Sequence, residues 1–157
     1  MGQKNDINHY GYKNSICIDA EHGFIRCFIV TSANIHDSQM LPMLLDPENQ
    51  DDYVWADSAY SGERFKDLLS LAGFANRIHE KGSRNHPLSA AATEHNSIRS
   101  QTRARVEHVF GCFATSMGVK FTRKIELKKN KAWESLKNLA FNFLHYLYLS
   151  SNSFASI

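Results

Sequence analysis

The segment YVWADSAYSG (residues 53–62) contains the pattern from which the fold class follows most directly. Its first four residues form a short apolar run, which is typical of a buried parallel strand. The run ends at Asp57, and a helix with regularly spaced apolar side chains is predicted to start near Glu63. A strand that leads directly into a helix favours an α/β fold.

Asp57 is the first candidate functional residue. Open α/β sheets place their ligand sites at the carboxyl ends of strands, and the residues that follow Asp57 are small. An approachable carboxylate at this position could serve as a metal ligand. The alternative is an ordinary turn or helix-capping aspartate, which is common in proteins.

Upstream of this segment, the sequence predicts an antiparallel hairpin. Tyr10–Ile18 and Phe24–Thr31 are rich in aromatic and β-branched residues, and a turn that contains Gly23 separates them. Asp37 or Ser38 can cap a short helix that runs to about Leu45.

Downstream, a further strand is predicted at Phe74–Ile78, followed by an irregular loop over residues 80–97. Apolar residues recur at helical spacing from about Ile98 to Met117 and again from Trp133 to Leu149. The predicted order of elements is that of an α/β domain with flanking helices.

The charges are distributed unevenly, although the net charge is only +2. Residues 99–131 contain nine lysines and arginines against two acidic residues, and this excess suits a polyanion or a solvated surface equally well. The three cysteines are widely spaced, which argues against a disulfide scaffold or a zinc site and fits a reducing cytosol. Neither a signal peptide nor a membrane span is predicted, because polar side chains interrupt the most apolar stretch.

Glu107 is the second candidate. It follows Arg103 by four residues, so the two side chains share one face of the predicted helix. The alternative is a surface ion pair that contributes roughly 0.3–0.5 kcal/mol. If this helix packs against the strand end that carries Asp57, the two carboxylates could share a magnesium ion, which prefers oxygen ligands.

Several segments of this sequence resemble, in the same order, the C-terminal catalytic portion of bacterial insertion-sequence transposases of the IS5 type, within the DDE group. The matching stretches are residues 10–14 (YGYKN), 24–30, 30–38 (VTSANIHDS), 56–62 (ADSAYSG) and 103–110 (RARVEHVF). The resemblance covers roughly residues 9–149. It implies an RNase H-like mixed sheet with flanking helices, with residues 1–149 as a partial catalytic domain and residues 150–157 as a C-terminal tail.

The resemblance also implies functional residues. Asp57 corresponds to the second acidic residue of the catalytic triad and Glu107 to the third, and both would hold Mg²⁺ or Mn²⁺. Arg103 corresponds to the arginine of the family's tyrosine–arginine–glutamate–lysine pattern and would orient Glu107 or a phosphate. The pattern's tyrosine and lysine positions are Ser100 and Ala114 here.

The first acidic residue of the triad has no counterpart. In the family it lies on a strand that precedes the tyrosine-rich strand, so the domain is expected to be truncated at its N-terminus, with the first strand absent. The sequence is therefore expected to be a fragment or a downstream reading frame that is inactive alone. Its expected partners are an upstream-frame transposase polypeptide or a full-length transposase.

The leading hypothesis is a DDE transposase that cleaves and joins DNA, with insertion-sequence ends and target DNA as partners in the bacterial cytoplasm and nucleoid. Its DNA backbone contacts are expected from a basic set, namely Arg99, Arg105, Lys120, Arg123, Lys124, Lys128 and Lys129. The alternatives are a non-catalytic remnant that binds DNA or transposase, and a metal-dependent nuclease that acts outside transposition.

Overall fold

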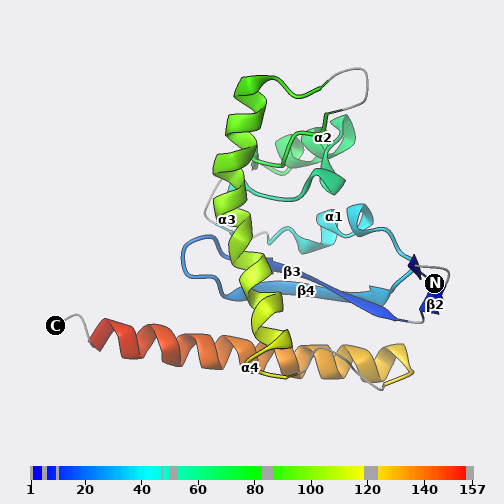
Figure 1. Ribbon diagram of the computed structural model, residues 1–157, viewed down its shortest axis with the longest axis vertical. Coiled ribbons are helices and arrows are strands. Elements are labelled where there is room, and N and C mark those ends of the chain that lie inside the picture. Colours follow the sequence, from blue (N-terminus) through cyan, green and yellow to red (C-terminus); the bar gives the residue numbers. More distant parts are fainter. Residues whose placement is uncertain are drawn as a thin grey trace. The chain divides into compact units, whose positions relative to one another are not determined.

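A computed structural model describes residues 2–4, 7–9, 11–46, 48–49, 53–82, 87–118 and 124–154 of the 157-residue chain. The elements, shown in Figure 1, are β1 (Gly2–Lys4), β2 (Ile7–His9), β3 (Tyr12–Ile18), β4 (Ile25–Ser32), the 3₁₀ turn η1 (Asp37–Gln39), α1 (Leu41–Leu44), β5 (Tyr53–Val54), η2 (Ser58–Tyr60), α2 (Glu63–Leu71), β6 (Ala75–Asn76), α3 (Ala90–Ala114) and α4 (Leu127–Phe154). Strands and helices are mixed along the chain, which confirms the predicted α/β class. The chain divides into two compact units, unit 1 with Met1–Ile35 and Val106–Ile157 and unit 2 with His36–Arg105.

The predicted hairpin is confirmed in unit 1. Strands β3 and β4 pair antiparallel, with Tyr12 opposite Ser32 at one end and a register shift between Cys17 and Ile18 at the other. In the turn, the Asp19 carboxylate accepts hydrogen bonds from the backbone N–H groups of residues 22, 23 and 24. Residue 23 has a φ of +83°, which glycine adopts without steric cost.

The core of unit 1 lies where α4 and the end of α3 pack on this hairpin. Its buried side chains are Ile25, Val109, Phe113 and Phe141. Asn142 of α4 accepts a hydrogen bond from the N–H of Ile25 and donates one to its carbonyl oxygen, both at 2.9 Å. The side chain thus satisfies the backbone groups of β4 at a position where a neighbouring strand would otherwise do so.

Unit 2 is built around the parallel pair β5 and β6. Tyr53 lies opposite Ala75, and the pairing continues past the strands, with Arg77 N–H donating to the Val54 carbonyl and His79 N–H to the Ala56 carbonyl. Helix α2 packs against β6. The buried cluster beneath it contains Leu41, Leu69 and Ile78.

Helix α3 begins earlier than predicted. It starts at Ala90, so the predicted loop over residues 80–97 is wrong for its last eight residues. Ser89 provides the cap, because its Oγ accepts a hydrogen bond from Ala92 N–H at 3.1 Å. The alanines at the start of the helix favour the helical conformation. Gly82 and Pro87 precede the helix and are not part of it.

Two other helix boundaries differ from the prediction. The helix predicted near residue 37 is a 3₁₀ turn followed by α1, and His36 rather than Asp37 or Ser38 provides its cap, accepting a hydrogen bond from Ser38 N–H. Helix α4 starts at Leu127 instead of Trp133 and continues to Phe154, so residues 150–154 of the expected tail are helical. Residues 155–157 lie outside the described part of the chain.

The strands form three two-stranded sheets, β1–β2, β3–β4 and β5–β6. Among the described strands, no pairing joins one of these sheets to another. The single mixed sheet of the RNase H-like expectation is therefore not seen in this part of the chain.

Candidate metal and DNA-binding site

Asp57 lies at the carboxyl end of the parallel pair in unit 2. Its backbone is extended, with φ −69° and ψ 160°, and it caps η2. One carboxylate oxygen accepts hydrogen bonds from the backbone N–H and the hydroxyl of Ser58. The strand end and the turn thus fix the carboxylate where ligands bind in α/β sheets.

The second oxygen of Asp57 faces helix α3. Its Oδ2 atom lies 2.9 Å from Nη1 of Arg103, and the two side chains remain 52% and 32% exposed, respectively. An ion pair this open to solvent contributes little to stability, so a cation or a phosphate can compete for either partner at small cost. This contact brings together two of the predicted site residues within one unit.

The charges of this ion pair act on two neighbouring titratable groups, His79 and Tyr60. Burial and the nearby Arg103 guanidinium lower the pKa of His79, although the charge of Asp57 acts in the opposite direction. Burial raises the pKa of Tyr60, and the charges of Asp37 and Asp57 add to this effect. His79 is therefore favoured in its neutral form and Tyr60 in its protonated form near neutral pH.

Nothing in the sequence pointed to His79 as a neighbour of Asp57. It is brought there because β6 pairs in parallel with β5, and its N–H donates to the Ala56 carbonyl, one residue before Asp57. Its Nε2 lies 3.5 Å from Oγ of Ser100, at the position where the family pattern has tyrosine. The useful signal would have been the second strand, at residues 74–78.

Glu107 and the last turns of α3 belong to unit 1. The Glu107 side chain is exposed on the helix, four residues after Arg103 in sequence. Ala114 is half-buried in the last turn of the same helix. It stands at the lysine position of the family pattern, so the positive charge of that lysine is absent here.

The two units divide the predicted acidic pair, with Asp57 in unit 2 and Glu107 in unit 1. Within the part of the chain that is described, no group of three His, Cys, Asp or Glu side chains is placed to hold a metal ion. Asp57 nevertheless suits a hard divalent cation, because Mg²⁺ uses one or two carboxylates and completes its shell with water and phosphate oxygens.

The predicted DNA-binding residues occupy different environments. Arg99 is only 15% exposed and donates to the Ile78 carbonyl at 2.7 Å, so its guanidinium joins α3 to the end of β6. Lys124 lies over the Trp133 ring, and Lys129 pairs with Glu126 at 2.8 Å. Arg105, Lys124, Lys128 and Lys129 are exposed, whereas Lys120 and Arg123 lie outside the described residues.

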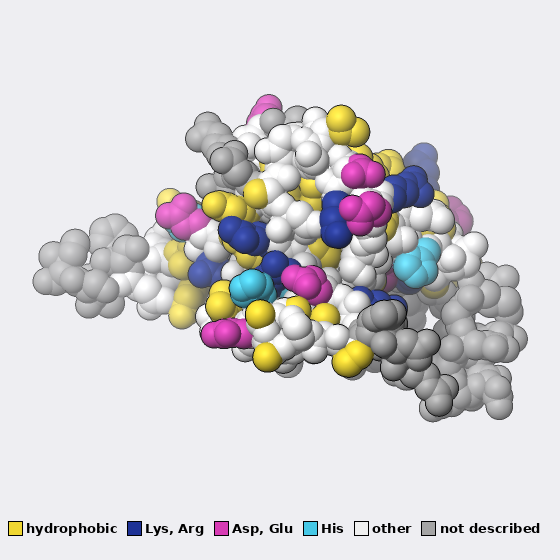
Figure 2. All heavy atoms as spheres, turned by 90° about the horizontal axis from the view of Figure 1, so that it is seen from above, with side chains coloured by type: hydrophobic (Ala, Val, Ile, Leu, Met, Phe, Trp, Pro, Cys, Tyr) yellow, Lys and Arg dark blue, Asp and Glu magenta, His cyan; other side chains and the backbone are white. Residues whose placement is uncertain are grey.

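The molecular surface carries mixed charges. Among the described residues in Figure 2, lysine and arginine side chains occur beside acidic and apolar ones.

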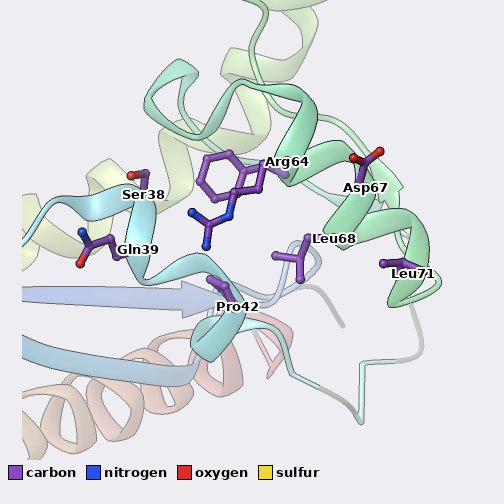
Figure 3. A pocket seen from close by; sticks show the side chains of 8 residues that line it. Ser38, Gln39, Pro42, Arg64, Asp67, Leu68 and Leu71 are labelled. Carbon is purple, nitrogen blue, oxygen red and sulfur yellow. The ribbon is translucent and has the colours of Figure 1, made fainter.

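A separate hollow lies in unit 2 between η1, α1 and α2. Its volume is about 760 Å³, and its lining includes Gln39, Pro42, Arg64 and Leu68. Figure 3 shows the Arg64 guanidinium pointing into the hollow and the Asp67 carboxylate pointing away from it. Neither Asp57 nor Arg103 lines this hollow, which is therefore distinct from the candidate site.

Comparisons with known proteins show the family of the chain. A family model described as "Transposase DDE domain" matches residues 2–143. The "Transposase for insertion sequence element IS1106" of Neisseria meningitidis serogroup B is 31% identical over 142 residues, which cover 90% of this chain and 49% of that protein. The chain thus spans about half the length of this relative. No solved structure matches, and no helix in the described ranges is long and apolar enough to cross a membrane.

Proposed function

Because the chain belongs to the DDE family of insertion-sequence transposases, we propose that it provides part of the catalytic domain that cleaves and joins DNA strands with a divalent cation. The observation that carries this proposal is the placement of Asp57. Its half-exposed carboxylate lies at the end of a parallel strand pair and is balanced by Arg103. Action on chromosomal DNA would place the protein at the bacterial nucleoid.

In this proposal, Asp57 and Glu107 hold Mg²⁺ or Mn²⁺, as in the family pattern that the sequence resembles. The bound cation supplies positive charge at the reacting phosphate and lowers the pKa of the attacking water. A further ligand is supplied by transposase sequence outside this chain. That sequence provides a strand that pairs with the strands of this chain in an RNase H-like sheet.

Arg103 has two roles in this scheme. Without DNA, its guanidinium neutralises Asp57, with Nη1 2.9 Å from Oδ2. If Asp57 held a cation, Arg103 would be able to donate two hydrogen bonds to a phosphate of the DNA strand. The residue thus positions the strand for in-line attack, in which an oxygen of water bonds to phosphorus and the bond to the 3′ oxygen breaks. The released 3′ hydroxyl attacks the target strand in the same geometry.

The basic residues around the end of α3 and the start of α4 hold the DNA backbone. We expect weak, sequence-independent binding with a log–log salt slope near −4 to −5, because about five phosphates lose their counterions. Replacing Lys128 and Lys129 with glutamine should reduce the magnitude of the slope by about 2, as measured by fluorescence anisotropy at several salt concentrations. The control replaces two exposed lysines of unit 2, Lys66 and Lys81, and should leave the slope unchanged. A slope near zero in the natural chain would contradict this role.

The direct test of the proposed function is a strand-cleavage assay with Mg²⁺ or Mn²⁺. We expect little cleavage by the chain alone, because two carboxylates leave the cations under-coordinated. Cleavage should begin when the half of the IS1106 transposase that lies outside the matched region is added, with DNA that carries the ends of that element. Robust cleavage by the chain alone would instead indicate a self-sufficient nuclease.

Cleavage in neither mixture would favour the second candidate, a non-catalytic remnant that binds DNA or transposase. The specific observation on its side is that the described residues hold no group of three metal-ligating side chains.

A further inference from the structure

Helix α4 exposes an unusually large apolar surface from Leu136 onward. Its members are large hydrophobic side chains, each between 52% and 63% exposed: Leu136, Leu139, Phe143, Leu144, Tyr146, Leu147 and Tyr148. We call these seven side chains the α4 apolar surface. Between Asn138 and Phe154 the sequence contains no Asp, Glu, Lys or Arg. A partner for this surface must therefore bind through apolar packing.

The contacts of α4 within unit 1 use its other side, where Phe141 packs in the core and polar side chains bond to the hairpin. Asn138 receives a hydrogen bond from Asn14 at 2.9 Å, and Asn142 bonds to both backbone groups of Ile25. His145 Nε2 lies 2.6 Å from the His22 carbonyl oxygen, to which it donates. Hydrogen bonds thus hold much of the helix to the hairpin, while most of its large apolar side chains face away.

The surface is large compared with those of stable monomers. If each half-exposed large side chain presents roughly 100 Å², the seven side chains present on the order of 700 Å². The largest apolar patch on a typical monomer is about 300–600 Å². A standard protein interface takes about 800 Å² from each partner. The α4 apolar surface is thus sufficient for a stable interface.

The width of the surface points to the kind of partner. At 100° per residue, its seven side chains cover an arc of about 200°, whereas the seam of a two-helix coiled coil is about half as wide. A helix from a second copy would cover one stripe, for instance Leu136, Leu139 and Phe143. An apolar arc this wide, on a helix whose other side already packs on the hairpin, is characteristic of a helix covered on both sides in a larger domain.

We propose that the α4 apolar surface binds the transposase sequence that lies outside the region shared by this chain and the IS1106 relative. The IS1106 relative is about twice as long as the region shared with this chain, so its other half offers a polypeptide of the required size. This inference rests on the proposed function and extends it: the partner completes the domain through the core around α4 as well as through the catalytic site.

The test is a binding titration without DNA or metal. The chain is mixed with the half of the IS1106 transposase outside the matched region, and complex formation is measured by sedimentation velocity. We expect a one-to-one complex that the double substitution Leu139→Glu and Phe143→Glu weakens at least about 100-fold. The matched control, Met43→Glu with Leu71→Glu, changes two exposed apolar residues of unit 2 and should leave the affinity unchanged.

A second version of the experiment joins the two polypeptides through a flexible linker, which raises their effective concentration to the millimolar range. The Leu139→Glu and Phe143→Glu pair should lower the unfolding temperature of the joined protein by about 10 °C or more and leave that of the chain alone nearly unchanged. Equal effects in both proteins, or no effect in either, would overturn the proposal.

Other results have equally definite meanings. If the chain alone is a dimer that the same two substitutions convert to a monomer, the occupant is a second copy and the proposal is wrong. The Asp57→Asn variant should bind the added half normally, because Asp57 lies in unit 2 outside the surface. Loss of docking with intact cation binding at Asp57 would overturn this inference alone, and the reverse result would overturn only the proposed function.

Discussion

Replacing Asp57 with asparagine should reduce strand cleavage by the combined transposase halves by about 10³-fold or more. The substitution keeps the size of the side chain and its capping of η2 but removes the negative charge that holds the cation, and metal catalysis contributes several kcal/mol to the stabilisation of the transition state. Product formation under single-turnover conditions with Mg²⁺ gives the rate.

The control for this prediction is Asp67→Asn. Asp67 is an exposed carboxylate of α2 in the same unit, and its side chain points away from the hollow in Figure 3. Its substitution should leave the rate within about a factor of two. If both variants lost activity equally, the effect of Asp57→Asn would come from removing a negative charge anywhere in unit 2 and not from a metal site. An unchanged rate in Asp57→Asn would contradict the assignment.

The substitution Phe141→Ala should destabilise unit 1 by about 3–5 kcal/mol. Phe141 is 2% exposed in the core cluster, its ring meets that of Phe113 edge to face at 5.8 Å between centroids, and it stacks on the His145 ring. Because a domain of this size has a total stability of about 5–15 kcal/mol, this loss would remove a large share of the stability of unit 1. Denaturant unfolding of the chain alone measures the effect.

The neighbouring Phe143→Ala provides the matched control, because the same side chain lies two residues further along α4 and is 63% exposed. In the chain alone it should change the free energy of unfolding by no more than about 0.5 kcal/mol. Similar losses from both substitutions would show that the two faces of α4 are equally buried in solution, contrary to the described packing.

The local elements could be predicted where short-range patterns determine them. The hairpin β3–β4 follows from aromatic and β-branched residues on either side of a turn with Gly23, and helix α2 follows from the spacing of its apolar side chains. Helix α3 was predicted to start too late because Gly82 and Pro87 outweighed the run of alanines that begins at Ala90. Alanine favours helix without contributing to an apolar periodicity.

The site could be predicted only in part. Asp57 and Arg103 could be named because they occur in sequence patterns, and the structure brings their side chains to 2.9 Å. His79 could not be found in this way, since its position depends on the parallel pairing of β6 with β5, which is a contact between distant segments. Arg99 was predicted to hold DNA, but its partners include the Ile78 carbonyl. An arginine that binds a carbonyl cannot be distinguished in sequence from one that binds phosphate.

The spacing of apolar residues in α4 predicts a helix but does not show which side of the helix is buried. The spacing of apolar residues from Trp133 to Leu149 correctly predicts a helix, and Phe141 is indeed in the core. The side that faces the hairpin carries Phe141 together with Asn138 and Asn142, whose amides bond to β3 and β4, so Phe143 and Leu147 are exposed. A pattern of apolar residues shows that a surface needs a partner but does not identify the partner.

The most direct test of the metal assignment is Mn²⁺ binding to the two halves combined, followed by electron paramagnetic resonance of the free ion. Both Asp57→Asn and Glu107→Gln should weaken Mn²⁺ binding by about tenfold or more, and the Asp67→Asn control should bind as the unsubstituted protein does. Weakened binding in both site variants is the result expected if one cation is shared by the two carboxylates. Unchanged Mn²⁺ affinity in either variant would contradict it.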